Sequence, residues 1–465
     1  MKLPPEVVDL IASLKREIEA LRAENAELRR RLGLDSSNSS KPPSSDGLRK
    51  KPRALKSLRT RTGKPSGGQK GHDGDTLRQV AEPDAIVEHA AEVCERCLAP
   101  LPANSKVGEE RRQVFDLPER LLLVTEHRAA VHDCPVCRWR TRAAFPEGVV
   151  SPAQYGERVR AAAVYLNAQQ LVPEERTAQI LNDLFDAAAA CGASVARWVR
   201  RKAEALAPVY HGIGACVAAA PVRCLDETGF RIAGATRWLH TASTLTHTFY
   251  RAGEPRSAVP EFAGGVVVHD HWRAYYALEN VLHAFCNAHL LRELQAIIEF
   301  DKEPWAEALR ATLLDASQAV QKAKAAGLSA LPPETVKAFE DRYWAAVREG
   351  LALHRSLPDF DPGKSPKKRK KQRPAHNLLL RFKTFKDATL RFLVDFTVPF
   401  TNNLAEQDLR MMKVKIKISG GFRTLQGAAD FASLRSVISS ARKQGLDILH
   451  ALTLGPERLA AELKL

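Results

Sequence analysis

Two short apolar runs in the second half of the chain each end in an acidic residue, and they limit the folds available to it. Residues 222–225 lead into Asp226 and Glu227, and residues 265–269 lead into Asp270. Runs of this length, rich in valine and bounded by turn-forming residues, are typical of buried strands. If the two strands are parallel neighbours, both aspartates lie at one edge of a sheet, where they can hold a metal ion.

The segments around these runs predict the rest of the sheet. Aromatic and β-branched residues predict strands at 238–241 and 246–250, and a further strand at 283–287 runs into a helix at 288–300. Three successive strands followed by strands alternating with helices predict a mixed α/β sheet with helices on its faces. We expect the first strand to end at Asp226. Glu227 alternates with it and should point away, as a surface residue or a neighbour of the ligands.

Glu406 is the best candidate for a third carboxylate. Asn402, Glu406 and Arg410 stand four residues apart and share one face of a predicted helix, with Lys413 close by. Asp408 falls on another face. An acid placed among amide and cationic groups suits a metal ligand that faces a phosphate.

The charge balance favours a polyanionic partner. The chain has 70 Lys and Arg against 54 Asp and Glu, a formal net charge of +16, and the excess is concentrated in runs. No apolar stretch approaches the roughly 18 residues of a membrane span, and the first 15 residues carry charges where a signal peptide would be apolar. We therefore expect a cytoplasmic protein without a membrane partner.

Residues 1–34 have the pattern of a dimeric coiled coil. Ile11, Ile18 and Leu32 share one heptad position with a single Asn25, and Leu or Val fills the other apolar position at 7, 14, 21 and 28. A lone asparagine in such a seam fixes register and favours two strands, so a homodimer is expected. The alternative is an amphipathic helix packed on the protein's own core.

Residues 35–75 contain mostly Ser, Pro, Gly and basic side chains, and they bury too little apolar surface to fold alone. Nine Lys or Arg and no acid lie within 49–70. The segment is predicted to be a disordered linker that contacts phosphates, or else a solvated tether.

Residues 76–150 are predicted to bind structural Zn²⁺. Two pairs with the spacing of zinc knuckles lie 36 residues apart, a longer gap than the roughly 15–20 of a usual ribbon, so strands are expected at 112–116 and 121–132. The ligands would be Cys94, Cys97, Cys134 and Cys137, and a redox dithiol is the alternative. The other cysteines, at 191, 216, 224 and 286, lack ligand spacing and are expected to fill cores.

Residues 151–215 have a helical pattern. Gly192 precedes Ser194, which we expect to be the N-cap of a basic helix. A helix, a glycine turn and a basic helix are compatible with a helix-turn-helix, but a helical scaffold leading into the catalytic region is at least as consistent with the sequence.

The catalytic region is expected in two parts, 216–300 and 375–465, separated by a helical insertion at 301–374. Helices are predicted at 305–322 and 333–355, and the insertion ends in a run of seven basic residues at 364–373 that is either a phosphate contact or a solvated loop. Residues 413–423 alternate charged with apolar side chains and contain two glycines, which predicts a strand or arm on DNA. The proposed DNA contacts are Arg410, Lys413, Lys415, Lys417 and Arg423.

Taken in order, the heptads, the segments at 38–46 and 67–72, the cysteine pairs, and the motifs at 226–228, 269–272, 286–289 and 402–406 resemble the insertion-sequence-66 family of DDE transposases. The resemblance covers nearly the whole chain. It implies a ribonuclease-H-like catalytic domain, a triad of Asp226, Asp270 and Glu406, and two Mg²⁺. It places His289 in a recurring motif and implies a bacterial mobile element that encodes companion proteins.

The resemblance implies cleavage at the ends of the element and joining of the freed 3′ hydroxyls to target DNA, with the protein associated with the nucleoid. Two alternatives remain open. One is a nuclease of the same fold that cuts without joining, and the other is a zinc-containing DNA-binding regulator whose catalytic domain is inactive.

Overall fold

The computed structural model describes residues 4–36, 38–39, 77–118, 121–185, 189–232, 234–257, 259–260, 262, 264–357 and 372–465. The predicted basic linker from residue 40 onward and the basic run at 364–371 lie outside these ranges. Within them, no helix is both long enough and apolar enough to cross a membrane.

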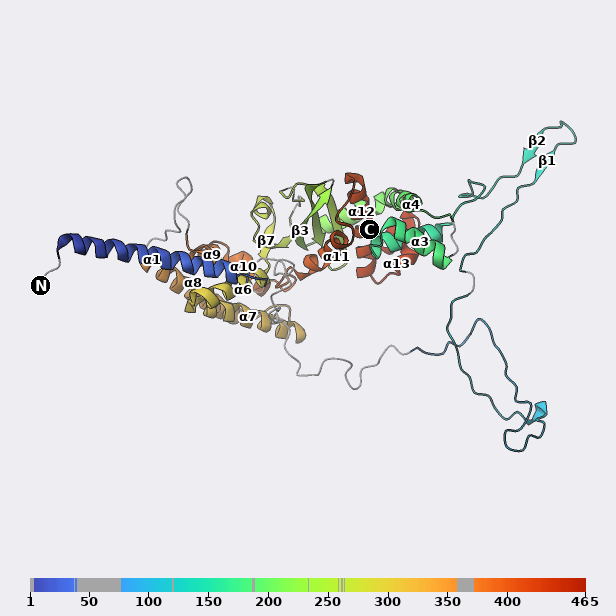
Figure 1. Ribbon diagram of the computed structural model, residues 1–465, viewed down its shortest axis with the longest axis horizontal. Coiled ribbons are helices and arrows are strands. Elements are labelled where there is room, and N and C mark those ends of the chain that lie inside the picture. Colours follow the sequence, from blue (N-terminus) through green and yellow to red (C-terminus); the bar gives the residue numbers. More distant parts are fainter. Residues whose placement is uncertain are drawn as a thin grey trace.

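A five-stranded mixed sheet forms the centre of the protein (Figure 1). Its strands are β3 (Val222–Ile232), β4 (Ala235–Ser243), β5 (Thr248–Glu254), β6 (Val266–His269) and β7 (Leu282–Phe285). They lie in the order β5-β4-β3-β6-β7, with β3, β4 and β5 antiparallel and with β6 and β7 parallel to β3. The predicted mixed sheet is confirmed, but β3 does not end at Asp226, because β4 pairs with it as far as Ile232.

One face of the sheet carries a helical layer. It consists of α6 (Asn287–Ala296), the short η5 (Ile297–Asp301), α7 (Pro304–Ala325), α8 (Pro333–Ser356), α9 (Pro374–Thr384) and α10 (Lys386–Val394). Trp305 and Tyr343 are fully buried in a core that reaches Cys224 on β3 and Val268 on β6. The two helices expected in the insertion are thus present as α7 and α8.

The opposite face and one edge of the sheet are covered by α5 (Ala207–Ala219), α12 (Leu425–Lys443), α13 (Ile448–Ala451) and α14 (Pro456–Glu462). The backbone N–H groups of Thr248 and Tyr250 on the edge strand β5 donate to the hydroxyls of Ser440 and Ser436, at 3.0 and 2.9 Å. Alternate strand residues match two serines one helical turn apart, so α12 satisfies an edge that would otherwise be open to pairing.

The segment predicted as a strand or arm is helical for most of its length. Helix α11 (Asn403–Ser419) continues through Lys413 to Lys417 and ends at Gly420, which has a left-handed backbone. Gly421 follows with φ of 146°, and a Cβ at this position would lie 2.3 Å from the carbonyl oxygen of Arg231. The absence of a side chain at Gly421 therefore allows the chain to pack closely on β3.

The helical region before the sheet comprises α2 (Glu157–Val164), η3 (Tyr165–Gln169), α3 (Glu174–Phe185) and α4 (Gly192–Ala205). The N-cap of α4 is Cys191, so the expectation of Ser194 was wrong. The Ser194 hydroxyl instead lies 3.4 Å from the Cys191 sulfur. Helices α3 and α4 pack on each other, and α4 also packs on α12 and α2 as part of the body that supports the sheet.

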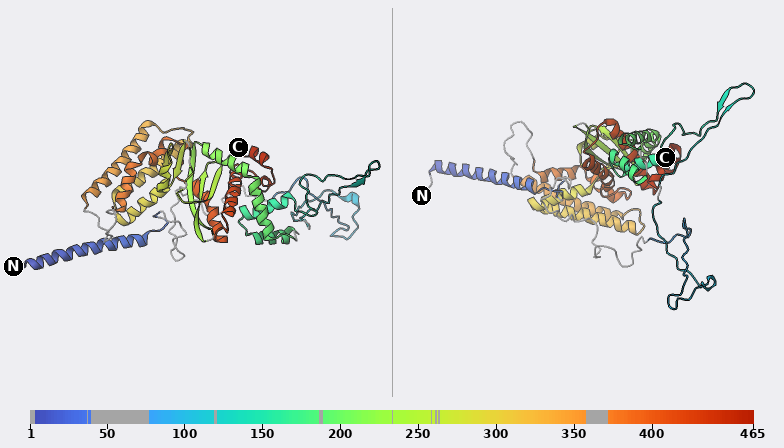
Figure 2. Two further views of the ribbon diagram at one scale, coloured as in Figure 1. Left: turned by 90° about the horizontal axis from the view of Figure 1, so that it is seen from above. Right: turned by 45° about the vertical axis from the view of Figure 1, so that its right-hand side comes forward.

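Helix α1 (Pro5–Gly33) projects away from the body at its N-terminal end (Figures 1 and 2). Its C-terminal end is attached to η5. The Asn38 amide donates to Glu299 at 2.9 Å and to the Gly33 carbonyl at 3.2 Å, and Asn38 is buried. The apolar side chains of the heptad seam are exposed, including Leu14, Leu21 and Leu28.

Residues 77–150 extend from the other side of the body and are mostly exposed (Figure 2). They contain one turn of helix, η2 (Ala103–Ser105), and one hairpin, β1 (Val131–Asp133) with β2 (Arg140–Arg142). The strand expected at 112–116 does not form, and of the strand expected at 121–132 only the last two residues belong to β1. The described part of this segment has few apolar contacts that would hold longer strands.

Candidate active site

The pairing of β3 with β6 brings two aspartates to one place. The parallel register pairs Val222 with Val266 and Cys224 with Val268, an offset of 44 residues. The same offset relates Asp226 to Asp270, which directly follows β6. The condition set by the sequence, that these two strands be parallel neighbours, is therefore met, and the register sets the two aspartates level at the point where β6 ends.

The two aspartates are partly buried and lie among like charges. Burial, followed by the charges of Glu227, Asp270 and Glu406, raises the pKa of Asp226 well above its ordinary value. Burial and the charge of Glu227, with a smaller contribution from Glu406, raise the pKa of Asp270 to about 6. The charges of Glu227 and Glu406 therefore both act on the two aspartates, with Glu227 making the larger contribution.

Glu227 acts on both aspartates through its charge, but its carboxylate has partners of its own. Its carboxylate accepts two hydrogen bonds from Arg256, at 2.8 and 3.0 Å, and a short one from the Tyr275 hydroxyl. Arg256 in turn stacks between the rings of Trp238 and Trp272. The side chain of Glu227 is only 3% exposed, so it is not a surface residue, and its charge is already compensated. This leaves Asp226 as the available carboxylate of the acidic pair.

Asn402 positions the third acid. It is the N-cap residue of α11, and its buried side-chain amide donates to the carbonyl of Leu225, directly before Asp226, at 2.6 Å. Glu406 lies one turn along α11, and its backbone N–H donates to the Asn402 carbonyl at 3.2 Å. One side-chain hydrogen bond therefore fixes the start of the helix that carries Glu406 against the strand that carries Asp226.

Cys286 and His289 lie beside Glu406. The Cys286 sulfur is 3.8 Å from Glu406 Oε1 and accepts the Asn402 backbone N–H at 3.1 Å, while His289 Nδ1 is also 3.8 Å from Glu406 Oε1. We had expected Cys286 to be a core residue without ligand spacing. It is buried, but it stands three residues before a histidine at the start of a helix, and that spacing was the signal we missed.

The donor atoms of the acidic cluster suit a divalent cation with a preference for oxygen. Asp226, Asp270 and Glu406 offer carboxylates, the ligands that Mg²⁺ favours, and their mutual repulsion is the condition that a bound cation relieves. No protein cation contacts the carboxylates of Asp226 or Asp270 among the ion pairs of the described residues, in contrast to Glu227. The residue types suit such an ion, although in the described part of the chain the ligand atoms of these three acids do not all lie within 4.8 Å of one another.

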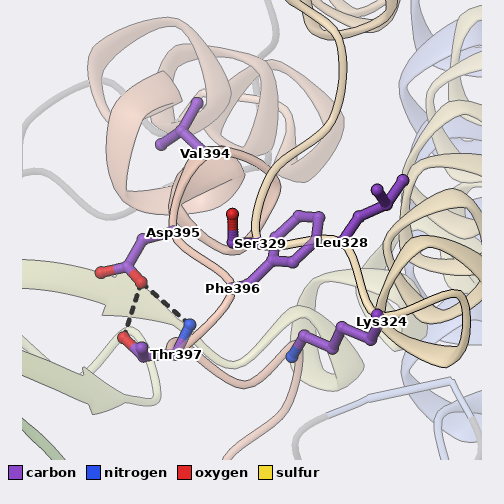
Figure 3. Close-up of a pocket in the computed structure, with 8 residues that line it drawn as sticks. Lys324, Leu328, Ser329, Val394, Asp395, Phe396 and Thr397 are labelled. Carbon is purple, nitrogen blue, oxygen red and sulfur yellow. Dashed lines mark hydrogen bonds between the residues drawn. The ribbon is translucent and has the colours of Figure 1, made fainter.

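One surface hollow lies away from these acids. It has a volume of about 500 Å³ and is open to solvent between the end of α7 and the loop after α10 (Figure 3). Asp395 lines it, but its carboxylate accepts hydrogen bonds from the backbone and hydroxyl of Thr397, at 2.9 and 2.6 Å. Asp226, Asp270 and Glu406 are not among the residues that line this hollow, so the hollow is not part of the candidate active site.

Residues 152–430, well over half of the chain, match the family described as Transposase IS66 family. The chain belongs to this family. The matched range includes both aspartates, Glu406 and all five strands of the sheet. Residues 3–78 match a family of unknown function, DUF6444. No match was found among curated proteins.

In this transposase the four cysteines predicted to bind zinc form two separate turns. In each turn the first cysteine accepts backbone N–H groups, foremost that of Cys97 for Cys94 and that of Cys137 for Cys134, and these bonds lower the pKa of the accepting thiol. A residue with positive φ follows each pair, Leu98 and Arg138. In the described part of the chain the two pairs do not come together as one cluster. Each cysteine pair therefore forms the tight turn expected of a zinc knuckle, and the site made of all four thiolates stays a prediction.

The five residues predicted to contact DNA fall into two groups. Arg410, Lys413, Lys417 and Arg423 are exposed. Lys415 is 6% exposed, burial lowers the pKa of its ammonium, and it lies 5.9 Å from the centre of the Phe422 ring. Lys415 therefore packs between α11 and the following turn and does not face a ligand.

The raised pKa of Asp270 predicts a pH-dependent stability in metal-free solution. A carboxyl group whose folded pKa is raised stabilises the fold at pH below its unfolded pKa and loses that contribution as pH rises through the folded pKa, here about 6. Asp270→Asn should therefore gain stability relative to the unmodified chain between roughly pH 4 and 7, by about 3 kcal/mol. Urea denaturation in EDTA measures the difference.

The exposed acid Glu279 provides the control, since Glu279→Gln should follow the unmodified chain at every pH. Added Mg²⁺ should restore stability at pH 7 to the unmodified chain and much less to Asp270→Asn. Parallel pH curves for Asp270→Asn and the unmodified chain would contradict the cluster described above.

Proposed function

We propose that this protein is a DDE transposase that cuts the ends of a bacterial insertion sequence and joins the freed 3′ hydroxyls to target DNA. The observation that carries the proposal is the parallel register that sets Asp226 level with Asp270, with Glu406 on α11 close enough for its charge to raise the pKa of both, inside the range that matches the transposase family. The order of three antiparallel and two parallel strands supports a ribonuclease-H-like catalytic domain.

Each acid has a defined part in this proposal. Asp226 and Asp270 would hold Mg²⁺ from the sheet, and Glu406 would complete the set from α11. When bound, two Mg²⁺ supply the positive charge that lets three carboxylates and a scissile phosphate occupy one site. Asn402 keeps Glu406 in reach, and the Arg256–Glu227–Tyr275 group prevents a fourth carboxylate from competing for the cation.

The same site serves two displacements at phosphorus. In cleavage, a water oxygen forms the new P–O bond and the 3′ oxygen at the element end leaves. In joining, that 3′ oxygen attacks a phosphate of the target, whose own 3′ oxygen leaves. Both steps need an attacking and a leaving oxygen in line and compensation of the same negative charge, so one cluster of acids suits both.

Removing any of the three acids should abolish both steps. Asp226→Asn, Asp270→Asn and Glu406→Gln each preserve size and remove a ligand charge, and a loss of several kcal/mol of transition-state stabilisation corresponds to at least about 10³-fold in rate. Product is measured on a gel after incubation of protein, Mg²⁺ and precut ends with a supercoiled target. Glu279→Gln is the control and should retain full activity.

The gel also separates the alternatives. A nuclease of the same fold would give nicks and no joined product with the unmodified chain. An inactive DNA-binding regulator would give neither, and excision from a donor plasmid would be unaffected by Asp226→Ala.

We further propose that exposed basic residues of α11 and the turn after it contact DNA phosphates near the acids. These are Arg410, Lys413, Lys417 and Arg423. Lys413→Ala combined with Lys417→Ala should weaken binding to DNA carrying the element ends and lower the slope of log K against log[salt] by about 1.8, or roughly 0.9 per lost contact. An unchanged slope would exclude both residues from the interface. Lys322→Ala, an exposed lysine of α7, is the control.

Three parts outside the catalytic region complete the proposal. The exposed seam of α1 would pair two copies into a homodimer, and Leu21→Glu, tested by sedimentation, should give monomers.

The four cysteines would bind one structural Zn²⁺, which a zinc determination on a Cys94→Ser chain tests. The helix pair α3–α4, the linker and companion proteins of the same element would serve DNA recognition and assembly in the cytoplasm, at the nucleoid.

A further inference from the structure

Cys286, His289 and Glu406 form a second cluster of ligand atoms behind the catalytic acids. One donor atom from each residue lies within 4.8 Å of the other two, and this is the one such group of three or more His, Cys, Asp or Glu found in the described residues. The sulfur and the imidazole nitrogen are each 3.8 Å from the same oxygen of Glu406. Neither Cys286 nor His289 is needed to hold the Mg²⁺ of the proposed function.

The separations are close to those of a tetrahedral zinc site. Zn–S of about 2.3 Å, with Zn–N and Zn–O of about 2.0–2.2 Å, put a thiolate and a carboxylate oxygen about 3.6 Å apart, and a nitrogen and that oxygen about 3.4 Å apart. The observed distances exceed these by a few tenths of an ångström. A small contraction around an ion would therefore complete three of four ligand positions and leave one for water.

The surroundings of each ligand fit this use. Cys286 directly follows β7 and is the N-cap residue of α6, and His289 lies in the first turn of that helix, a rigid placement for two ligands three residues apart. The sulfur accepts the Asn402 backbone N–H, a bond that steadies a metal thiolate. His289 Nδ1 is buried without a hydrogen-bond partner and lies toward Glu406.

We propose that Cys286, His289 and Glu406 bind one Zn²⁺ or a similar ion with an affinity for sulfur and nitrogen, at a site distinct from the one for Mg²⁺. Binding releases the Cys286 thiol proton to solvent as the metal–sulfur bond forms. Because Glu406 belongs to both ligand sets, occupancy by Zn²⁺ withdraws it from the catalytic cation. The metal site does not depend on the proposed function. Inhibition by the bound ion does depend on it, because inhibition requires that Glu406 also holds the catalytic Mg²⁺.

Co²⁺ provides the test, since its bond to a thiolate absorbs in the near ultraviolet. The full chain is titrated with Co²⁺ without DNA or Mg²⁺, and then back-titrated with Zn²⁺. The unmodified chain should bind one equivalent more than Cys286→Ser. Loss of a residue that hydrogen-bonds to a metal ligand costs about 10- to 100-fold in metal affinity, so the loss of a direct ligand should cost at least about 100-fold.

Cys224→Ser is the matched control, because Cys224 is a buried cysteine on β3 that is not in the cluster, and this variant should retain the extra equivalent. His289→Gln, which alters a partly exposed side chain, should lose the extra equivalent even if Cys286→Ser folds poorly. Equal Co²⁺ stoichiometry in the unmodified chain, in Cys286→Ser and in His289→Gln would overturn the site.

Inhibition is scored separately, as the ratio of Mg²⁺-dependent cleavage with and without micromolar Zn²⁺. In the unmodified chain this ratio should fall well below one. If the extra equivalent binds while Mg²⁺ supports no cleavage, the proposed function fails and the zinc site stands. If cleavage depends on the three acids while the extra equivalent is missing, the reverse holds.

Discussion

The parallel pairing of β3 with β6 is the constraint on which the candidate site depends. Its register places Asp226 level with Asp270, and the helical layers on both faces exclude the water that would otherwise solvate the two carboxylates. Moving that register by one residue would turn one aspartate toward the opposite face. The apolar residues of both strands, Cys224, Val266 and Val268 on one face, prevent such a shift because they would leave the core.

A buried cluster of like charges is unfavourable, and the fold limits the cost by treating its four acids differently. Glu227 points to the opposite face, where Arg256 and the Tyr275 hydroxyl compensate it. Asp226 and Asp270 receive only single backbone N–H bonds, at 2.9 and 3.0 Å, so their charge remains for an external cation. The protein is therefore strained electrostatically at one point, as expected where a cation binds.

Much of this could be predicted from the sequence, because short apolar runs ending in acids specify both strand and edge. The sheet composition, the helices of the insertion and the placement of Glu406 on a helix follow from local patterns. The alternation of charged and apolar residues at 413–419 led to the wrong prediction of a strand. A short stretch of α-helix can show the same alternation when one of its lysines, here Lys415, is buried. The partners of Glu227 and the contact of Cys286 with Glu406 join residues 29 and 120 positions apart, and no local pattern encodes them.

Asn402 connects these observations. Its side chain fixes α11 to β3 through the Leu225 carbonyl, and its backbone N–H fixes the same helix to the Cys286 sulfur. Glu406 is consequently held where a thiol and an imidazole lie 3.8 Å from one of its oxygens and where its charge acts on Asp226 and Asp270. Hard divalent ions favour the first set and borderline-soft ions favour the second. The choice of metal at this junction therefore depends on a single carboxylate that both sets need and that only one of them can use at a time.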